Sequence, residues 1–197
     1  MFIRIKMILS CALVSLSASL LGEVEYVEIK WTPGLCSESC AKNLRTQFSK
    51  TAGVASSEVS ASSAQAKLHW KPNVTFSFGP INAAMSMIGL SMTELRVKVR
   101  GTIIHDAKTV TLVSLGDNTR FQLLGPTQAS KTGYAIAHNI NSHPLPPDTR
   151  TKLLDAQTQK QVVTVEGPLF EPERSPPLYL ITEKLNVIVP ETSATSK

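Results

Sequence analysis

The sequence lacks an apolar run long enough to cross a membrane. Its longest run, Met7–Leu21, is fifteen residues, whereas a transmembrane helix needs about 20. Arg4 and Lys6 precede this run, and acidic residues begin at Glu23. This pattern predicts an export signal over residues 1–22. We therefore expect an exported protein, periplasmic or secreted, with no transmembrane segment once the signal is removed.

Motifs that carry common catalytic chemistry are also missing. The sequence has no serine nucleophile elbow, no phosphate-binding glycine loop and no paired-carboxylate motif, so we expect that the protein is not an enzyme. The charge imbalance is small, since without Arg4 and Lys6 the chain has 18 basic against 15 acidic residues. We therefore expect no nucleic acid as a partner.

Cysteine is scarce. There are three cysteines, and Cys11 lies within the predicted signal, which leaves Cys36 and Cys40. In an exported protein such thiols are oxidised to a disulfide or held by a metal ion. The pair lies in the stretch WTPGLCSESC, between a predicted strand and a predicted helix.

Residues 23–96 show a pattern of elements in the order β, α, β, β, α, β, which predicts a ferredoxin-like domain. In the first strand, VEYVEIKW, the alternation places Val24, Tyr26 and, after a slip of one residue, Ile29 and Trp31 inward. The first helix begins near Cys40 and shows one apolar face. That face consists of Cys40 or Ala41, Leu44, Phe48 and Ala52. A hairpin over VASSEVSASS and AQAKLHWKP, a helix opened by Gly79 and Pro80 and ended by Gly89, and the strand ELRVKVRG complete the domain.

Residues 97–190 show a different pattern of five strands with one helix between the third and fourth. Asp148 is the expected N-cap of that helix. This order predicts a small β-barrel that resembles an OB-fold, which mostly serves binding. The strand that begins at Leu95 serves both halves. The overall fold class is α+β, and residues 191–197 are expected to be a disordered tail.

The first domain resembles the heavy-metal-associated domain of copper chaperones and metal-pumping ATPases, over roughly residues 24–100. The resemblance rests on the segment GLCSESC at a helix start, the following GV, the strands EVSASS and KLHWKP, and a second helix that ends in IGL. In that family the loop reads Gly, Met, any residue, Cys, any, any, Cys, and its two thiolates hold copper(I). The resemblance aligns Cys40 with the second metal cysteine and Ser37 with the first, with Cys36 one residue earlier.

The residues leave two interpretations of the pair open. Cys40 near a helix start, with Lys42 and Arg45 close in sequence, favours a thiolate, which both chemistries need. Two cysteines four apart within a helix would have Cβ atoms about 5 to 6 Å apart, wider than a disulfide requires. With Cys36 in the loop, both a disulfide and a soft-metal site for Cu(I) or Zn are possible.

Several other residues are candidate ligands. Met92, with Met85 and Met87 nearby, is the best candidate for a third, thioether ligand, although methionines on such a helix are usually core residues. His138 and His143 lie in the long segment before the last helix, where we expect solvated side chains rather than a second metal site.

Three functional hypotheses follow. The first is a non-catalytic protein that binds a soft metal such as copper(I) through Cys36 and Cys40, with the barrel contacting a protein partner in the exported compartment. The second is a structural or adaptor protein that has lost its metal, with Cys36 and Cys40 joined as a disulfide. The third is nucleic-acid or glycan binding by the barrel, which clustering of four basic residues with an exposed aromatic side chain would favour. Those residues are Arg96, Lys98, Arg100 and Arg120.

Overall fold

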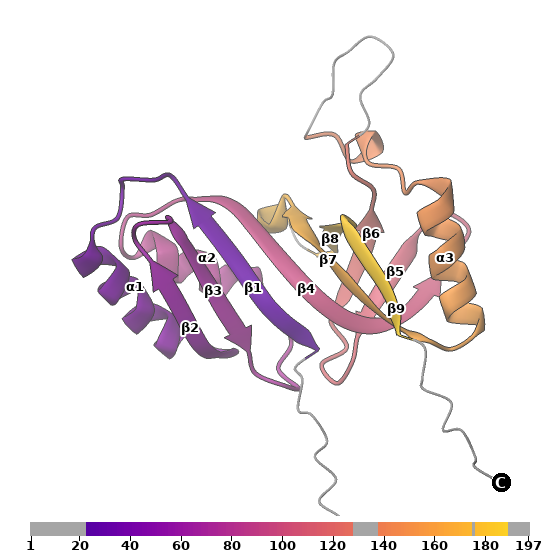
Figure 1. Cartoon of the computed structure of the whole chain (residues 1–197), viewed down its shortest axis with the longest axis horizontal. Helices are drawn as coiled ribbons and strands as arrows, with labels where there is room; N and C mark the ends of the chain where they lie inside the picture. The colour runs from indigo at the N-terminus through magenta and orange to yellow at the C-terminus, as the bar shows by residue number, and fades with distance from the viewer. Residues whose placement is uncertain (1–22, 128–137, 175, 189–197) are drawn as a thin grey trace, which may run out of the picture.

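The computed structural model describes residues 23–127, 138–174 and 176–188. Over these residues the chain has a mixed α+β fold, mostly sheet, with three α-helices and a closed barrel of five strands (Figure 1). The expected export signal, residues 1–22, and the expected tail, residues 191–197, lie outside the described residues. No helix within the described ranges is long and apolar enough to span a bilayer.

The N-terminal half is a four-stranded antiparallel sheet with two helices against one face (Figure 1). Its elements are β1 (Val24–Trp31), α1 (Glu38–Lys50), β2 (Val54–Ser60), β3 (Gln65–Trp70), α2 (Phe78–Ser86) and β4 (Met92–His105). Neighbouring strands pair in the order β2-β3-β1-β4. The chain order β, α, β, β, α, β agrees with the sequence pattern, because alternating apolar residues form the strands and apolar residues three or four apart form the helices.

The buried face of β1 differs in one place from the expected one. Val24, Val27, Ile29 and Trp31 are buried, while Tyr26 is only partly covered. The cause is a register shift between Val24 and Tyr26 in the pairing of β1 with β4. A shift of this kind moves every following side chain to the other face of the strand. It lies between Val24 and Tyr26, earlier than the slip that the alternation predicted between Tyr26 and Ile29.

The first helix begins earlier and ends earlier than expected. Ser37 is the N-cap of α1, and its side chain accepts a hydrogen bond from the Cys40 amide at 3.4 Å. The helix buries three residues of the predicted face, namely Ala41, Leu44 and Phe48. Ala52 lies beyond the helix end and is exposed. The helix stops at Lys50 because the chain turns at Thr51, whose extended backbone cannot continue a helix.

Strand β4 belongs to both halves of the molecule. Its first part pairs with β1 from Met92 to Val99, and its last part, Gly101–His105, pairs with β5 (Val110–Ser114). The expected domain boundary between residues 96 and 97 therefore lies inside one continuous strand. Figure 1 shows β4 running from the N-terminal sheet into the barrel without a linker.

The barrel closes through the strand order β4-β5-β6-β8-β7, with β7 pairing back onto β4. Its remaining elements are β6 (Arg120–Leu124), η1 (Ile140–Ser142), α3 (Pro147–Thr158), β7 (Val162–Phe170), η2 (Pro172–Arg174), β8 (Leu178–Ile181) and β9 (Lys184–Ile188). Strand β8 is parallel to β6, and the other neighbouring pairs are antiparallel. The barrel interior is apolar, with side chains such as Leu112, Phe121 and Leu180 fully buried.

Two expectations about the barrel are corrected. The N-cap of α3 is Pro146 rather than Asp148, which lies in the first turn, where its negative charge faces the helix N-terminus favourably. The stretch LYLITEKLNVIV, predicted as one strand, is interrupted at Thr182 and Glu183, so that β8 and β9 are separate. At the break the Thr182 amide still donates to the Leu124 carbonyl of β6 at 2.7 Å, whereas the next amide, that of Glu183, donates to the Glu166 carbonyl of β7 at 3.1 Å, so the chain changes its partner strand here.

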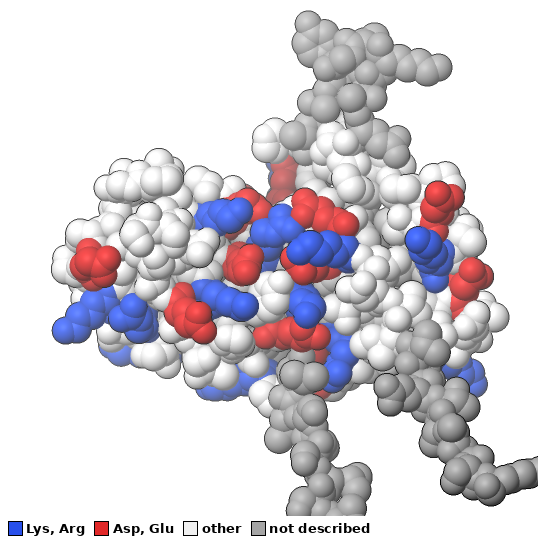
Figure 2. All heavy atoms as spheres, in the orientation of Figure 1, with Lys and Arg blue, Asp and Glu red and all other residues white. Residues whose placement is uncertain are grey.

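Ion pairs join the two halves on the open face of the sheet, which the helices leave uncovered. Figure 2 shows side chains of both signs mixed in the centre of this face. Arg96 pairs with Glu94 at 3.0 Å and also with Glu183, and Lys184 pairs with Glu166 at 2.8 Å. Burial, together with the nearby Glu166 carboxylate, raises the pKa of Tyr26 to about 12. These contacts connect β1 and β4 to β7 and β9 without leaving a large field of one sign.

The turn between β4 and β5 gives a testable pH effect. The Asp106 carboxylate accepts hydrogen bonds from the amides of Lys108 and Thr109, both at 2.7 Å, and these bonds lower its pKa from 3.8 to about 2. A lowered pKa stabilises the fold above pH 3.8, and this contribution is lost as the pH falls toward 2. We expect Asp106→Asn to lose less stability than the wild type over that window.

Urea unfolding at a series of acidic pH values measures this effect. Asp155→Asn is the matched control, because it removes one carboxylate from the exposed surface of α3, outside any turn. Equal acid sensitivity of Asp106→Asn and the wild type would show that the turn does not depend on the charged carboxylate.

Candidate functional site: the Cys36–Cys40 loop

The candidate loop connects the end of β1 to the start of α1. After Trp31 the chain turns at Gly34, whose φ of +83° suits a glycine, and the exposed side chain of Leu35 follows. Cys36 then turns inward and is 6% exposed, as part of the core. Ser37 ends the loop as the N-cap of α1. The local sequence therefore places one cysteine before the helix and the other in its first turn.

Cys36 and Cys40 are joined by a disulfide, with their Cα atoms 5.3 Å apart. Within a continuous helix, residues four apart hold their Cβ atoms too far apart for this bond. Cys36 avoids that restriction because it precedes the N-cap and does not follow the helical path. Of the two arrangements that the spacing left open, the structure has the one with Cys36 in the loop.

Ser37, at the position that aligns with the first cysteine of the metal-binding motif, has a structural role. Its hydroxyl oxygen accepts the Cys40 amide and lies 2.9 Å from the hydroxyl of Ser39. A serine at an N-cap satisfies one of the helix amides that has no partner within the helix. Cys36 thus lies in the loop, directly before the N-cap Ser37, and its sulfur bonds to that of Cys40 in the first turn of the helix.

The charges around the loop are more balanced than the sequence suggested. Lys42 is exposed, but the guanidinium of Arg45 is directed to the β2 edge, where it donates to the Val59 carbonyl at 3.0 Å. Glu38 adds a negative charge to the first turn of α1, beside Cys40. The support for a thiolate at Cys40 is therefore the helix N-terminus and Lys42, with Glu38 acting against it.

The three methionines are dispersed. Met85 is fully buried in the core, which agrees with the usual role of methionine on such a helix, and Met87 is 73% exposed. Met92 is the first residue of β4, pairs with Trp31, and lines a hollow beside α2 that also contains Phe170 and Glu171 of the barrel. Neither cysteine is among the described residues that line that hollow. A thioether ligand at Met92 stays a prediction.

The expectation for one of the histidines was wrong. His138 is exposed and lies 3.3 Å from a carboxylate oxygen of Glu171. His143 is buried, with its Nδ1 3.1 Å from the Gly125 carbonyl and its ring 5.1 Å from the ring of Phe170. The alternation that marks buried strand positions does not apply in an irregular segment, so no pattern in the sequence indicates this burial. His138 and His143 are not brought into a metal-binding group with other described residues.

Among the residues that the structure describes, no three His, Cys, Asp or Glu side chains are grouped so as to hold a metal ion. Zinc in proteins usually has four such ligands, whereas copper(I) is bound by soft sulfur donors. Two cysteines, with or without a methionine, supply only sulfur donors, the kind that binds copper(I). A soft-metal site for Cu(I) or Zn at this pair stays a prediction.

The four basic residues proposed for the third hypothesis do not form one free patch. Arg96 and Lys98 are paired with carboxylates on the open face, the latter with Glu25 at 2.6 Å. Arg120 is an exposed residue of β6, on the far side of β5 from β4. Because their charges are offset by carboxylates, Arg96 and Lys98 give no support to polyanion binding on this face.

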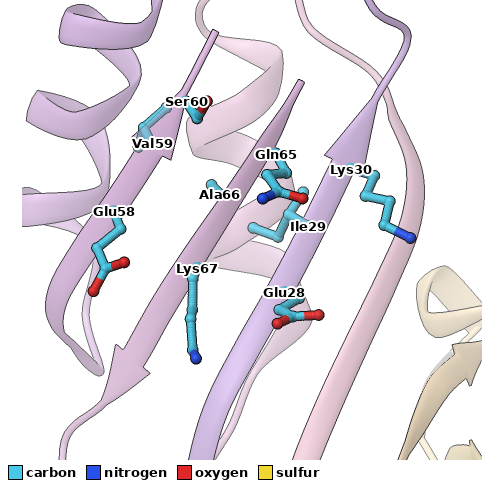
Figure 3. A pocket seen from close by; sticks show the side chains of 9 residues that line it. All are labelled: Glu28, Ile29, Lys30, Glu58, Val59, Ser60, Gln65, Ala66 and Lys67. Carbon is cyan, nitrogen blue, oxygen red and sulfur yellow. The ribbon is translucent and has the colours of Figure 1, made fainter. Parts of the chain in front are cut away.

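A shallow hollow on the open face illustrates the same balance of charge (Figure 3). It lies over β1, β3 and β2, and its volume is about 190 Å³. Figure 3 shows Glu28 and Glu58 pointing outward near Lys30 and Lys67. With charges of both signs on its walls, this hollow selects for neither an anion nor a cation.

The comparisons with known proteins give no relative. No protein-family model matches the chain, and searches of curated proteins and of solved structures found no match. The resemblance to heavy-metal-associated domains therefore rests on the sequence motifs of the N-terminal half alone.

The small size of the disulfide ring gives a prediction about stability. The disulfide joins residues only four apart in sequence, so it restricts the conformations of the unfolded chain only slightly. We therefore expect the double variant Cys36→Ala, Cys40→Ala to lose no more than about 2 kcal/mol of the free energy of unfolding. Urea unfolding of the variant, and of the wild type with and without reductant, measures this loss. A loss of twice that size would mean that the bond is a main support of the fold.

Proposed function

We propose that the chain is an exported, non-catalytic protein of structural or adaptor type, built from a heavy-metal-associated-like domain joined to an OB-like barrel. The strand order β2-β3-β1-β4, with both helices against one face, supports the ferredoxin-like assignment of residues 23–96. The order β4-β5-β6-β8-β7, with α3 between β6 and β7, supports the OB-like assignment of the second half. Export and a protein partner are part of the same proposal.

The observation that carries this proposal is the disulfide between Cys36 and Cys40. In the resembled family the corresponding loop offers two free thiolates, and a thiolate is the form that binds metal. A disulfide sulfur has no charge to offer a copper ion. The disulfide therefore favours a domain that has the fold of the resembled family but whose loop is closed by a covalent bond and does not bind metal in this state.

Mass spectrometry after alkylation tests the proposal. The protein is isolated from the exported fraction without reductant, unfolded, and treated with iodoacetamide. We expect no added carbamidomethyl group, because both mature cysteines are in the disulfide, and two added groups after reduction. Two groups without reduction would contradict the proposal. N-terminal sequencing of the same sample shows whether residues 1–22 have been removed.

The second candidate is copper(I) binding by the reduced pair. The observation that favours it is the position of both sulfurs at the start of α1, where Cys40 is only partly buried and the helix amides favour negative charge. The loop at Gly34 and Leu35 could adjust to the S–Cu–S geometry after reduction. In this case the disulfide is the storage form and a reductant activates the site.

Copper(I) titration of the reduced protein tests the second candidate. One equivalent taken up by the wild type, and none by Cys36→Ala, Cys40→Ala, would support it. Met92→Leu tests the third ligand, and the matched control is Met87→Leu, which changes an exposed methionine. Equal uptake by the wild type and the double cysteine variant would exclude this site.

A further inference from the structure

A hollow in the barrel carries positive charge without negative charge on its lining. It has a volume of about 400 Å³ and lies between the β4–β5 turn, β6, the segment around η1 and the first turns of α3. Its charged lining residues are Lys108 and Arg150, and no Asp or Glu lines it among the described residues. Thr109, Gln122 and Asn141 add neutral hydrogen-bonding groups. This composition differs from that of the open face of the sheet.

The two cations lack carboxylate partners in the part of the chain that the structure describes. Arg96 and Lys98 on the open face are in ion pairs, whereas Lys108 and Arg150 form no ion pair with any other residue that the structure describes. The carboxylate nearest in sequence to Lys108 is Asp106, which accepts three hydrogen bonds from Lys108 and Thr109 within its own turn. An anion that enters the hollow would therefore meet two cations whose charge is not already offset by an ion pair.

The elements that carry the two cations are tied to each other. Lys108 lies on a turn fixed by Asp106, and the preceding residue, His105, contacts the side-chain oxygen of Gln157 on α3 through its Nδ1. Arg150 lies in the first turn of the same helix, where its amide donates to the Pro146 carbonyl at 2.9 Å. Little conformational entropy is then lost at the backbone when a ligand bridges the two side chains.

We propose that this hollow is a binding site for a phosphate group, with Lys108 and Arg150 as the residues that neutralise it. The planar guanidinium of Arg150 suits two phosphate oxygens, and Lys108 supplies a point charge. Gln122 and Asn141 line the same hollow and carry side-chain amides that can donate to the remaining oxygens, whereas the Thr109 hydroxyl already donates to Asp106. The volume exceeds that of phosphate alone, so the group belongs to a small phosphorylated molecule or to a phospholipid headgroup. The inference is independent of the state of the cysteines.

Isothermal titration of the mature protein with inorganic pyrophosphate at low ionic strength tests the proposal. We expect saturable binding to one site, weakened about tenfold by Arg150→Gln and by Lys108→Gln, because each removes one charge-assisted hydrogen bond. The matched control is Lys42→Gln, which removes one exposed positive charge from α1 in the other half of the molecule. Thermal unfolding without ligand checks that each variant is folded.

A second arm distinguishes the two sources of the phosphate group. The same proteins are sedimented with vesicles of phosphatidylglycerol and phosphatidylcholine in equal parts. Binding to vesicles that requires Lys108 and Arg150 supports the site with a lipid headgroup as the ligand. Pyrophosphate binding alone supports it with a small molecule. Absence of saturable binding to both probes, or an equal loss in Lys42→Gln, would overturn the proposal, since charge alone would then explain the contacts.

Discussion

Gly167→Ala is expected to destabilise the protein by about 3 kcal/mol, because the added methyl group has no room. A Cβ at this position would overlap the carbonyl oxygen of Ile181, a backbone atom that cannot rotate away. Gly167 lies where the partner of β7 changes from β9 to β8, and on its other side it pairs with Val97 of β4. The substitution therefore disturbs the place where the barrel closes.

Gly79→Ala is the matched control for Gly167→Ala. Gly79 lies in α2, has no positive φ, and has open space where a Cβ would be. Alanine favours a helix over glycine, but the ring of Pro80 crowds a Cβ on the residue before it, so we expect stability to change by no more than about 0.5 kcal/mol. Urea unfolding measures both variants. A Gly167→Ala protein as stable as the wild type would mean that β7 and β8 do not approach as closely as described.

Leu112→Ala, in the barrel, is expected to lower the stability that tryptophan fluorescence reports for the other half. Leu112 is fully buried, so its truncation costs about 3 kcal/mol. The two tryptophans of the chain, Trp31 and Trp70, both lie in the N-terminal sheet. Because β4 is shared and no linker separates the halves, we expect a single unfolding transition that shifts as a whole.

Leu44→Ala provides the matched change in the N-terminal half. Leu44 is fully buried on the inner face of α1. Its truncation to alanine is expected to lower the free energy of unfolding by an amount similar to that of Leu112→Ala. Both variants should shift the same urea transition of tryptophan fluorescence by comparable amounts. A fluorescence transition that is unchanged in Leu112→Ala would show that the halves unfold independently, against the role given to β4.

Much of the N-terminal half follows from local patterns in the sequence. The span Val24–Trp31 is a strand as predicted, and Ala41, Leu44 and Phe48 form the buried face of α1. These features depend on residues close in the chain, where alternation and helical spacing act directly. The register shift after Val24 was placed wrongly, because a shift depends on the partner strand β4 as well as on β1 itself.

The barrel shows what local patterns do not determine. The break between β8 and β9 lies where the chain changes its partner from Leu124 of β6 to Glu166 of β7, and neither partner is close to it in sequence. His143 is likewise buried by contacts with residues distant in sequence, Gly125 and Phe170. Lys108 and Arg150 are brought to one hollow only by barrel closure, so no spacing in the sequence could have indicated them.

The cysteine pair lies between these two cases. The sequence left open whether Cys36 lies in the helix or in the loop, and whether the pair forms a disulfide or binds a soft metal. The Ser37 N-cap decides where the helix begins. With the helix start at Glu38, Cys36 lies outside it and the disulfide becomes possible. The deciding signal was a serine three residues before Cys40, which is a common N-cap residue.

Native mass spectrometry of the protein isolated from the exported fraction, without reductant or chelator, shows whether Cys36 and Cys40 form a disulfide or hold a metal ion. We expect a metal-free chain that is lighter by two hydrogens than its sequence requires, because the two cysteines form a disulfide. A stoichiometric copper or zinc adduct that disappears in Cys36→Ala, Cys40→Ala would contradict it, and would assign the loop to metal binding.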